Sequence, residues 1–69
     1  MTFKRYGEKA EISQNLMDAI AVHMDDDIRE AVHFDFALCS PEKFLAEYIR
    51  RDPSFEELLK IEFSIEPEV

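Results

Sequence analysis

The stretch Cys39–Lys60, CSPEKFLAEYIRRDPSFEELLK, contains two helix-start signals that decide the fold. Ser40 is able to accept a hydrogen bond from a free backbone N–H, and Pro41 has the φ angle preferred at the first helical position. The residues that follow are apolar at helical spacing: Phe44, Leu45, Tyr48 and Ile49. A second start at Asp52-Pro53 predicts a shorter helix, with Asp52 as its cap and Pro53 as its first residue.

Two further helices are predicted upstream of this stretch. Residues 11–24 carry apolar side chains at three- and four-residue steps, which indicates a helix with Ser13 or an earlier residue near its start. The run Asp25-Asp26-Asp27 then supplies side chains that cap a following helix and interact with its positive end. Residues 28–36 fit that helix, although residues 32–38 also alternate as a strand does. We favour the helix.

The C-terminal segment is open to two interpretations. Residues 61–66 alternate strictly between apolar and polar, which fits a short strand or an extended tail on the core. The other interpretation is that the preceding helix continues through this segment, with Phe55, Leu59 and Phe63 at helical spacing. We expect Pro67 to end either arrangement. The chain is therefore predicted to be all-α, a small bundle of three to four short helices. The alternative is α+β, with a small sheet formed by residues 32–38 and 61–65.

Length and charge define the class of protein. A chain of 69 residues is expected to form a single domain. Residues 1–10 hold three basic residues and one acidic residue, and we expect residues 1–9 to be a basic N-terminal arm. The other five basic and fifteen acidic residues lie in residues 11–69, which gives that part a formal charge of -10. This balance disfavours direct binding to DNA or RNA phosphates.

The single cysteine and the hydropathy pattern indicate a cytoplasmic protein. Cys39 has no intramolecular disulfide partner, and a lone thiol suits a reducing compartment. No apolar run has the length of a signal peptide or a membrane span, so no membrane association is expected. Cys39 precedes a helix start and His33 lies upstream as a potential base, but nothing else completes a catalytic set. We expect Cys39 to fill the core and predict no enzyme activity.

No metal site or cofactor is predicted either. The residues His23, His33 and Cys39 lack the paired spacing of a zinc site. The run Asp25-Asp26-Asp27 does not begin a calcium loop, because Glu30 falls where the sharp-turn glycine belongs. The sequence also contains no glycine-rich phosphate loop. Since no metal or cofactor site is predicted, the acidic surface is the remaining candidate for the function.

Acidic helices are able to imitate a nucleic acid. Carboxylates one helical turn apart lie about 5 to 6 Å apart along the axis, comparable with the spacing of charges on a nucleic-acid strand. The candidate partner-binding residues are Asp18, Asp25, Asp26, Asp27, Glu30, Asp35, Glu56, Glu57 and Glu62, followed by Glu66 and Glu68. The alternative is a solvated surface that keeps the domain soluble.

In its size, its net charge of -8, its aspartate run and its acidic stretch Glu56–Glu68, the chain resembles a known group of inhibitors. These are the short acidic proteins encoded by phages and other mobile elements, including many anti-CRISPR proteins and other DNA mimics. The resemblance implies a stoichiometric blocker that occupies a basic nucleic-acid groove on a host defence complex. The alternative is a helical interaction module or homodimer without mimicry, for which Phe34 and Phe36 would supply an apolar patch.

Overall fold

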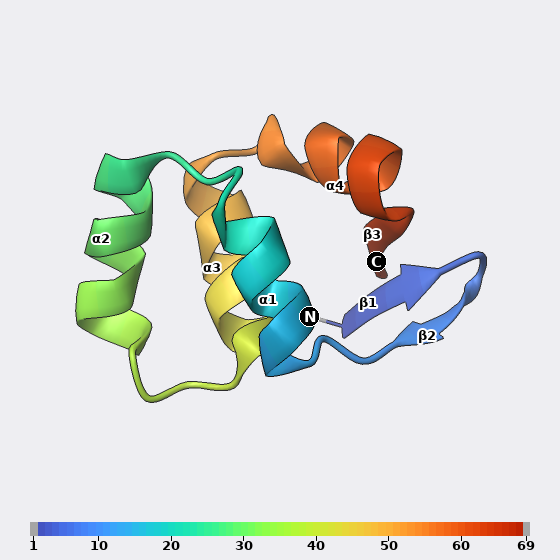
Figure 1. Ribbon diagram of the computed structural model, residues 1–69, viewed down its shortest axis with the longest axis horizontal. Coiled ribbons are helices and arrows are strands. Elements are labelled where there is room, and N and C mark those ends of the chain that lie inside the picture. The colour runs from blue at the N-terminus through green and yellow to red at the C-terminus, as the bar shows by residue number, and fades with distance from the viewer. Residues whose placement is uncertain (1, 69) are drawn as a thin grey trace.

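The computed structural model describes residues 2–68 and shows an α+β fold (Figure 1). In chain order the elements are β1 (Thr2–Arg5), β2 (Glu8–Ala10), α1 (Gln14–Ala21), α2 (Asp26–Phe36), α3 (Pro41–Arg51), α4 (Phe55–Phe63) and β3 (Ile65–Glu68). Helices α1, α2 and α3 form one end of the molecule, and the sheet forms the other end, beside α4 (Figure 1). The all-α prediction is therefore wrong, and its α+β alternative has the correct class.

The N-terminal residues form a hairpin. Strands β1 and β2 are antiparallel, with Phe3 opposite Ala10, and they are joined by Tyr6 and Gly7. Both linking residues have positive φ, 55° and 82°, which is the backbone of a two-residue hairpin turn whose twist matches that of the strands. Residues 2–5 and 8–9, which we expected in a basic arm, thus belong to the sheet.

The third strand comes from the other end of the chain. Strand β3 runs antiparallel to β1, so the order in the sheet is β2-β1-β3. Pro67 does not end the segment as expected but lies within β3, opposite Phe3. An edge strand tolerates proline because one row of its backbone groups needs no partner in the sheet.

Of the two segments proposed for the sheet, residues 32–38 take no part in it, and residues 61–65 contribute only Ile65. Residues 32–36 lie in α2, as the favoured helix prediction required. Residues 61–63 continue α4, as the helical interpretation of Phe63 required. Ser64 then takes a left-handed conformation with φ of 55°, which ends the helix and turns the chain into β3. The strand therefore begins at Ile65, later than the alternation of residues 61–66 indicated.

Side-chain caps explain why three helices begin where the sequence predicted. Ser13 Oγ accepts from the Leu16 N–H at 3.1 Å before α1, and Ser40 Oγ accepts from the Lys43 N–H at 3.3 Å before α3. The Asp25 carboxylate caps α2 by accepting two backbone N–H groups. These three predictions are confirmed.

The start of α4 was predicted wrongly. The helix begins at Phe55, after a turn that contains Pro53, and its N-cap residue makes no side-chain capping bond. Asp52 is instead the C-cap residue of α3. Its carboxylate accepts hydrogen bonds from the Tyr48 hydroxyl at 3.0 Å and the Ser54 hydroxyl at 2.8 Å. Both bonds compete with capping, so Asp52 joins the two helices without starting the second.

The core joins the sheet to the helices. Its fully buried large side chains come from both parts of the fold: Tyr48, Phe3, Ile20, Leu45, Leu59, Ile65 and Val32. The rings of Tyr48 and Phe55 meet edge to face, with centroids 4.7 Å apart, where α3 contacts α4. Burial of Phe3 and Ile65 therefore makes the sheet part of the single core.

Helix α2 lies at the outer edge of the molecule and packs on α3 (Figure 1). Val32 is fully buried in this contact. Arg51 of α3 reinforces it, because its guanidinium reaches Asp35 of α2 at 3.0 Å and Glu47 of its own helix at 3.0 Å. Glu47 and Arg51, four residues apart, therefore form an ion pair within α3. The side of α2 that faces away from α3 is open to solvent.

Candidate partner-binding surface

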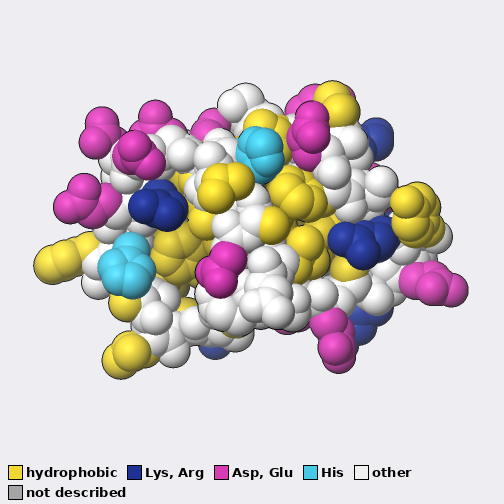
Figure 2. Space-filling model, viewed as in Figure 1, with side chains coloured by type: hydrophobic (Ala, Val, Ile, Leu, Met, Phe, Trp, Pro, Cys, Tyr) yellow, Lys and Arg dark blue, Asp and Glu magenta, His cyan; other side chains and the backbone are white. Residues whose placement is uncertain are grey.

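Four acidic residues surround the first turn of α2: Asp25, Asp26, Asp27 and Glu30, here called the α2 acidic cluster. All four are exposed. Asp25 is the N-cap residue, and its carboxylate accepts from the N–H groups of Asp27 and Ile28 at 3.0 and 3.1 Å. The positive end of the helix dipole favours negative charge here. Figure 2 shows acidic side chains gathered over this end of α2, at the upper left.

A buried tyrosine fixes the position of the cluster. The Asp25 N–H donates to the Tyr48 hydroxyl at 2.7 Å, and that hydroxyl donates to Asp52 Oδ2 at 3.0 Å. Burial raises the pKa of Tyr48, so the phenol keeps the proton that it donates. The sequence predicted Tyr48 only as an apolar helix residue. The four-residue spacing of Tyr48 and Asp52 was the signal for a hydroxyl–carboxylate pair within one helix.

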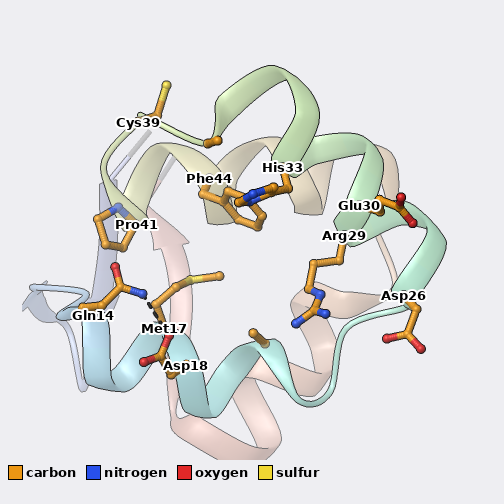
Figure 3. A pocket seen from close by; sticks show the side chains of 12 residues that line it. Gln14, Met17, Asp18, Asp26, Arg29, Glu30, His33, Cys39, Pro41 and Phe44 are labelled. Carbon is orange, nitrogen blue, oxygen red and sulfur yellow. Dashed lines mark hydrogen bonds between the residues drawn. The ribbon is translucent and has the colours of Figure 1, made fainter.

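A groove of about 540 Å³ separates α1 from α2 beside the cluster. In Figure 3, Met17 and Arg29 point into it, and the His33 ring lies beside the Phe44 ring, with centroids 6.3 Å apart. Carboxyl-bearing residues border the groove from both helices: Asp18 on α1, and Asp26 and Glu30 on α2. The fold therefore places Asp18 across a groove from two members of the α2 acidic cluster.

Asp35 differs from the other predicted acidic residues of α2. It lies in the last part of the helix, where its carboxylate binds Arg51. Arg51 also contacts Glu47, whose pKa is lowered to about 2, mainly by a hydrogen bond from Arg50 and further by Arg51. These charges hold α2 against α3, so Asp35 is part of the fold and its charge is matched.

The C-terminal acidic residues lie elsewhere. The predicted residues Glu56, Glu57 and Glu62 are exposed on α4, on a different element from the α2 acidic cluster (Figure 1). Glu66 contacts Lys4 at 3.6 Å, and Glu68 accepts from the Thr2 hydroxyl at 2.8 Å. The fold thus divides the predicted acidic residues between a cluster bordering a groove, a separate helix and paired positions on the sheet.

The thiol considered for catalysis is not where we expected it. Cys39 is exposed in the loop between α2 and α3, so the prediction of a core filler is wrong. Cys39 and His33 both line the groove, and the Cys39 sulfur points away from it in Figure 3.

Residues 2–68 hold no group of three or more His, Cys, Asp or Glu side chains arranged to bind a metal ion. Among the helices within this range, none combines the length and apolar character needed to cross a bilayer.

Comparison with known families gives one result. The family model described as Anti-CRISPR protein AcrIC5 matches residues 6–51, which are 46 of the 69 residues. The chain belongs to this anti-CRISPR family. No curated protein and no solved structure matches it. The predicted resemblance to anti-CRISPR inhibitors is confirmed.

Membership of the anti-CRISPR family indicates the class of activity. The chain is an anti-CRISPR inhibitor, and proteins of this class bind components of CRISPR–Cas systems. The matched residues 6–51 include α1, α2 and α3, and with them the α2 acidic cluster and the groove. Helix α4 and strand β3 lie beyond the match.

Proposed function

We propose that this anti-CRISPR chain inhibits by placing the α2 acidic cluster in a basic groove of a CRISPR–Cas component, where nucleic acid otherwise binds. One observation carries the proposal. The four carboxylates of the cluster are exposed, and none forms an ion pair with any residue in the range 2–68. An unmatched group of carboxylates on one rigid element is suited to replace a row of phosphates.

The geometry of α2 supports this role. Asp26 and Glu30 are one helical turn apart, which is about 6 Å along the axis and comparable with the charge spacing of a nucleic-acid strand. Asp18 adds a carboxylate from the other side of the groove. The net charge of -8 would also attract the chain to a basic surface over long range and speed association. Capping and the Tyr48 hydrogen bond hold the cluster in place before it binds.

The acidic residues of α4 supply a matched control. Glu56, Glu57 and Glu62 are equally exposed, but they lie outside the matched residues 6–51. Replacing these three by Gln, or replacing Asp26, Asp27 and Glu30 by Asn, Asn and Gln, changes the net charge from -8 to -5 in each case. The two variants therefore remove the same amount of charge from different parts of the molecule. Asp25 is kept because its side chain caps α2.

Binding to a purified CRISPR–Cas effector complex over a salt series tests the proposal. We expect Asp26→Asn/Asp27→Asn/Glu30→Gln to bind at least about tenfold more weakly than the wild type, with a shallower salt dependence. Glu56→Gln/Glu57→Gln/Glu62→Gln should stay within about threefold of the wild type. Circular dichroism checks that both variants keep their helices. Equal losses for the two variants would mean that bulk charge, and not α2, governs binding.

A further inference from the structure

Two exposed apolar side chains, Phe34 and Leu38, lie on the outward face of α2 toward its C-terminal end, and we call them the apolar patch. Phe34 is 89% exposed and Leu38 is 103% exposed. Helical spacing places Asp27, Ala31 and Phe34 on one stripe, and Leu38, just beyond the helix end, follows at the next position. The stripe lies opposite Val32, which is fully buried against α3. One side of α2 thus belongs to the core, and the other side presents carboxylates followed by two large apolar side chains.

This patch has no role in the fold. Other large apolar side chains are exposed singly, at Tyr6, Val22 and Ile61 on other parts of the chain, and such single exposures are ordinary. Phe34 and Leu38 differ because they are four residues apart, in the last turn of α2 and just beyond its end. Exposed apolar side chains gathered in this way mark surfaces that bind another molecule.

We propose that the outward face of α2 docks on the CRISPR–Cas target, with Phe34 and Leu38 as apolar anchors in a hollow next to the basic groove. The inference rests on the proposed function and adds a second feature to the partner. Asp27 and Phe34 are seven residues apart, which is about 10 Å along the helix. The target surface would therefore place cationic side chains about 10 Å from an apolar hollow.

Charge indicates which kind of molecule binds this face. A basic protein surface complements Asp27 and Glu30, which flank the apolar residues on the same helix. A second copy of this chain carries the same net charge of -8 and would be repelled. A nucleic acid is also a polyanion and is disfavoured for the same reason. The occupant is thus a cationic protein surface that contains an apolar hollow.

The two parts of the face have separable effects on binding. Exposed carboxylates act mainly on the association rate and make it dependent on salt. Apolar anchors that become buried act mainly on the dissociation rate, and their effect changes little with salt. Variants of the two parts therefore give different kinetic patterns with the same target.

The experiment measures association and dissociation rates on an immobilised, purified CRISPR–Cas effector complex at about 0.1 M and about 0.5 M salt. The test variant is Phe34→Ser/Leu38→Ser, and the matched control is Ile61→Ser, which removes an apolar side chain that is 70% exposed on α4. We expect the test variant to lose about 10- to 100-fold in affinity at both salt concentrations through faster dissociation. The control should match the wild type, and thermal unfolding should show that all three proteins are equally stable.

Each other outcome is decisive. Equal affinity of the test variant and Ile61→Ser would overturn the docking face. A wild-type dimer in light scattering that Phe34→Ser/Leu38→Ser converts to a monomer would also overturn it, because a second copy would then cover the patch. Loss of binding in the apolar variant but not in Asp26→Asn/Asp27→Asn/Glu30→Gln would refute mimicry and retain the docking face. Loss of binding in the carboxylate variant but not in the apolar variant would overturn the docking face and retain mimicry. A wild-type chain that does not bind the complex would contradict both proposals.

Discussion

The sheet end and the α2 end of the molecule use charged side chains in opposite ways. In the sheet, Lys4 of β1 lies opposite Glu66 of β3 in the strand register, and their side chains meet at 3.6 Å. Glu68 likewise accepts a hydrogen bond from Thr2 across the same two strands. At α2, the carboxylates of the first turn meet no cation within residues 2–68. Glu66 and Glu68 of the sheet are thus bound within the fold, whereas the carboxylates at the start of α2 are left for a partner.

This difference shows that net charge alone does not locate a binding surface. The acidic residues are spread along the whole sequence, yet several of them are already held by Lys4, Thr2 or Arg51. The exposed carboxylates on helices that form no ion pair are the remaining candidates, and they include the α2 acidic cluster and Glu56, Glu57 and Glu62 of α4. Positions used by the fold are therefore expected to respond to substitution differently from chemically similar positions exposed to solvent.

The largest effect is expected for a buried phenylalanine of the sheet. Phe3 is completely buried, so Phe3→Ala should lower the free energy of unfolding by about 3 to 5 kcal/mol. Phe34→Ala makes the same chemical change at a side chain that is 89% exposed, and it should stay within about 0.5 kcal/mol of the wild type. Urea denaturation followed by circular dichroism measures both. Similar losses for the two variants would show that the sheet is not part of the core.

An intermediate effect is expected at the hydroxyl that positions the acidic cluster. Tyr48→Phe leaves the Asp25 N–H and the Asp52 carboxylate without their shared partner, which should cost about 1 to 3 kcal/mol of stability. Tyr6→Phe removes the same hydroxyl at a side chain that is 85% exposed and should have no measurable effect. Denaturation gives the stabilities, and amide exchange should be faster at Asp25 only in Tyr48→Phe. An unchanged amide exchange rate at Asp25 would mean that the Tyr48 hydroxyl does not hold the α2 acidic cluster in position.

The smallest effect is expected at the ion pairs that Glu47 forms within α3. The pKa of Glu47 is lowered from 4.5 to about 2 by Arg50 and Arg51. The ionised carboxylate therefore adds stability that is fully present above pH 4.5 and is lost as the pH falls through about 2. In Glu47→Gln, the fall of the urea midpoint over this pH range should be shallower than in the wild type. Parallel pH profiles would mean that Glu47 does not contribute.

Local chemistry explains which parts of the fold could be predicted from the sequence. Ser13, Asp25 and Ser40 each cap a helix through a backbone N–H two or three residues ahead, so the signal and the structure lie close together in the chain. The sheet was missed because its strands have only three or four residues, too few for a clear alternating pattern. Its central pairing also joins Thr2 to Glu68, at opposite ends of the chain.

The candidate surface could be predicted only in part for a related reason. Composition identified the acidic residues, and the aspartate run identified the start of α2 correctly. Which carboxylates remain free depends on tertiary contacts, such as the pairing of Asp35 with Arg51 sixteen residues away. The exposure of Phe34 is also a tertiary property. It is set by which side of α2 faces α3, and the sequence left the interpretation of residues 32–38 open between helix and strand.

Displacement of labelled nucleic acid from a purified CRISPR–Cas effector complex tests the central claim most directly. The wild type and Glu56→Gln/Glu57→Gln/Glu62→Gln should displace the nucleic acid at similar concentrations. Asp26→Asn/Asp27→Asn/Glu30→Gln should need at least about ten times more protein, because it lacks the carboxylates that compete with phosphates. Wild-type protein that binds the complex while the labelled nucleic acid stays bound would contradict the account.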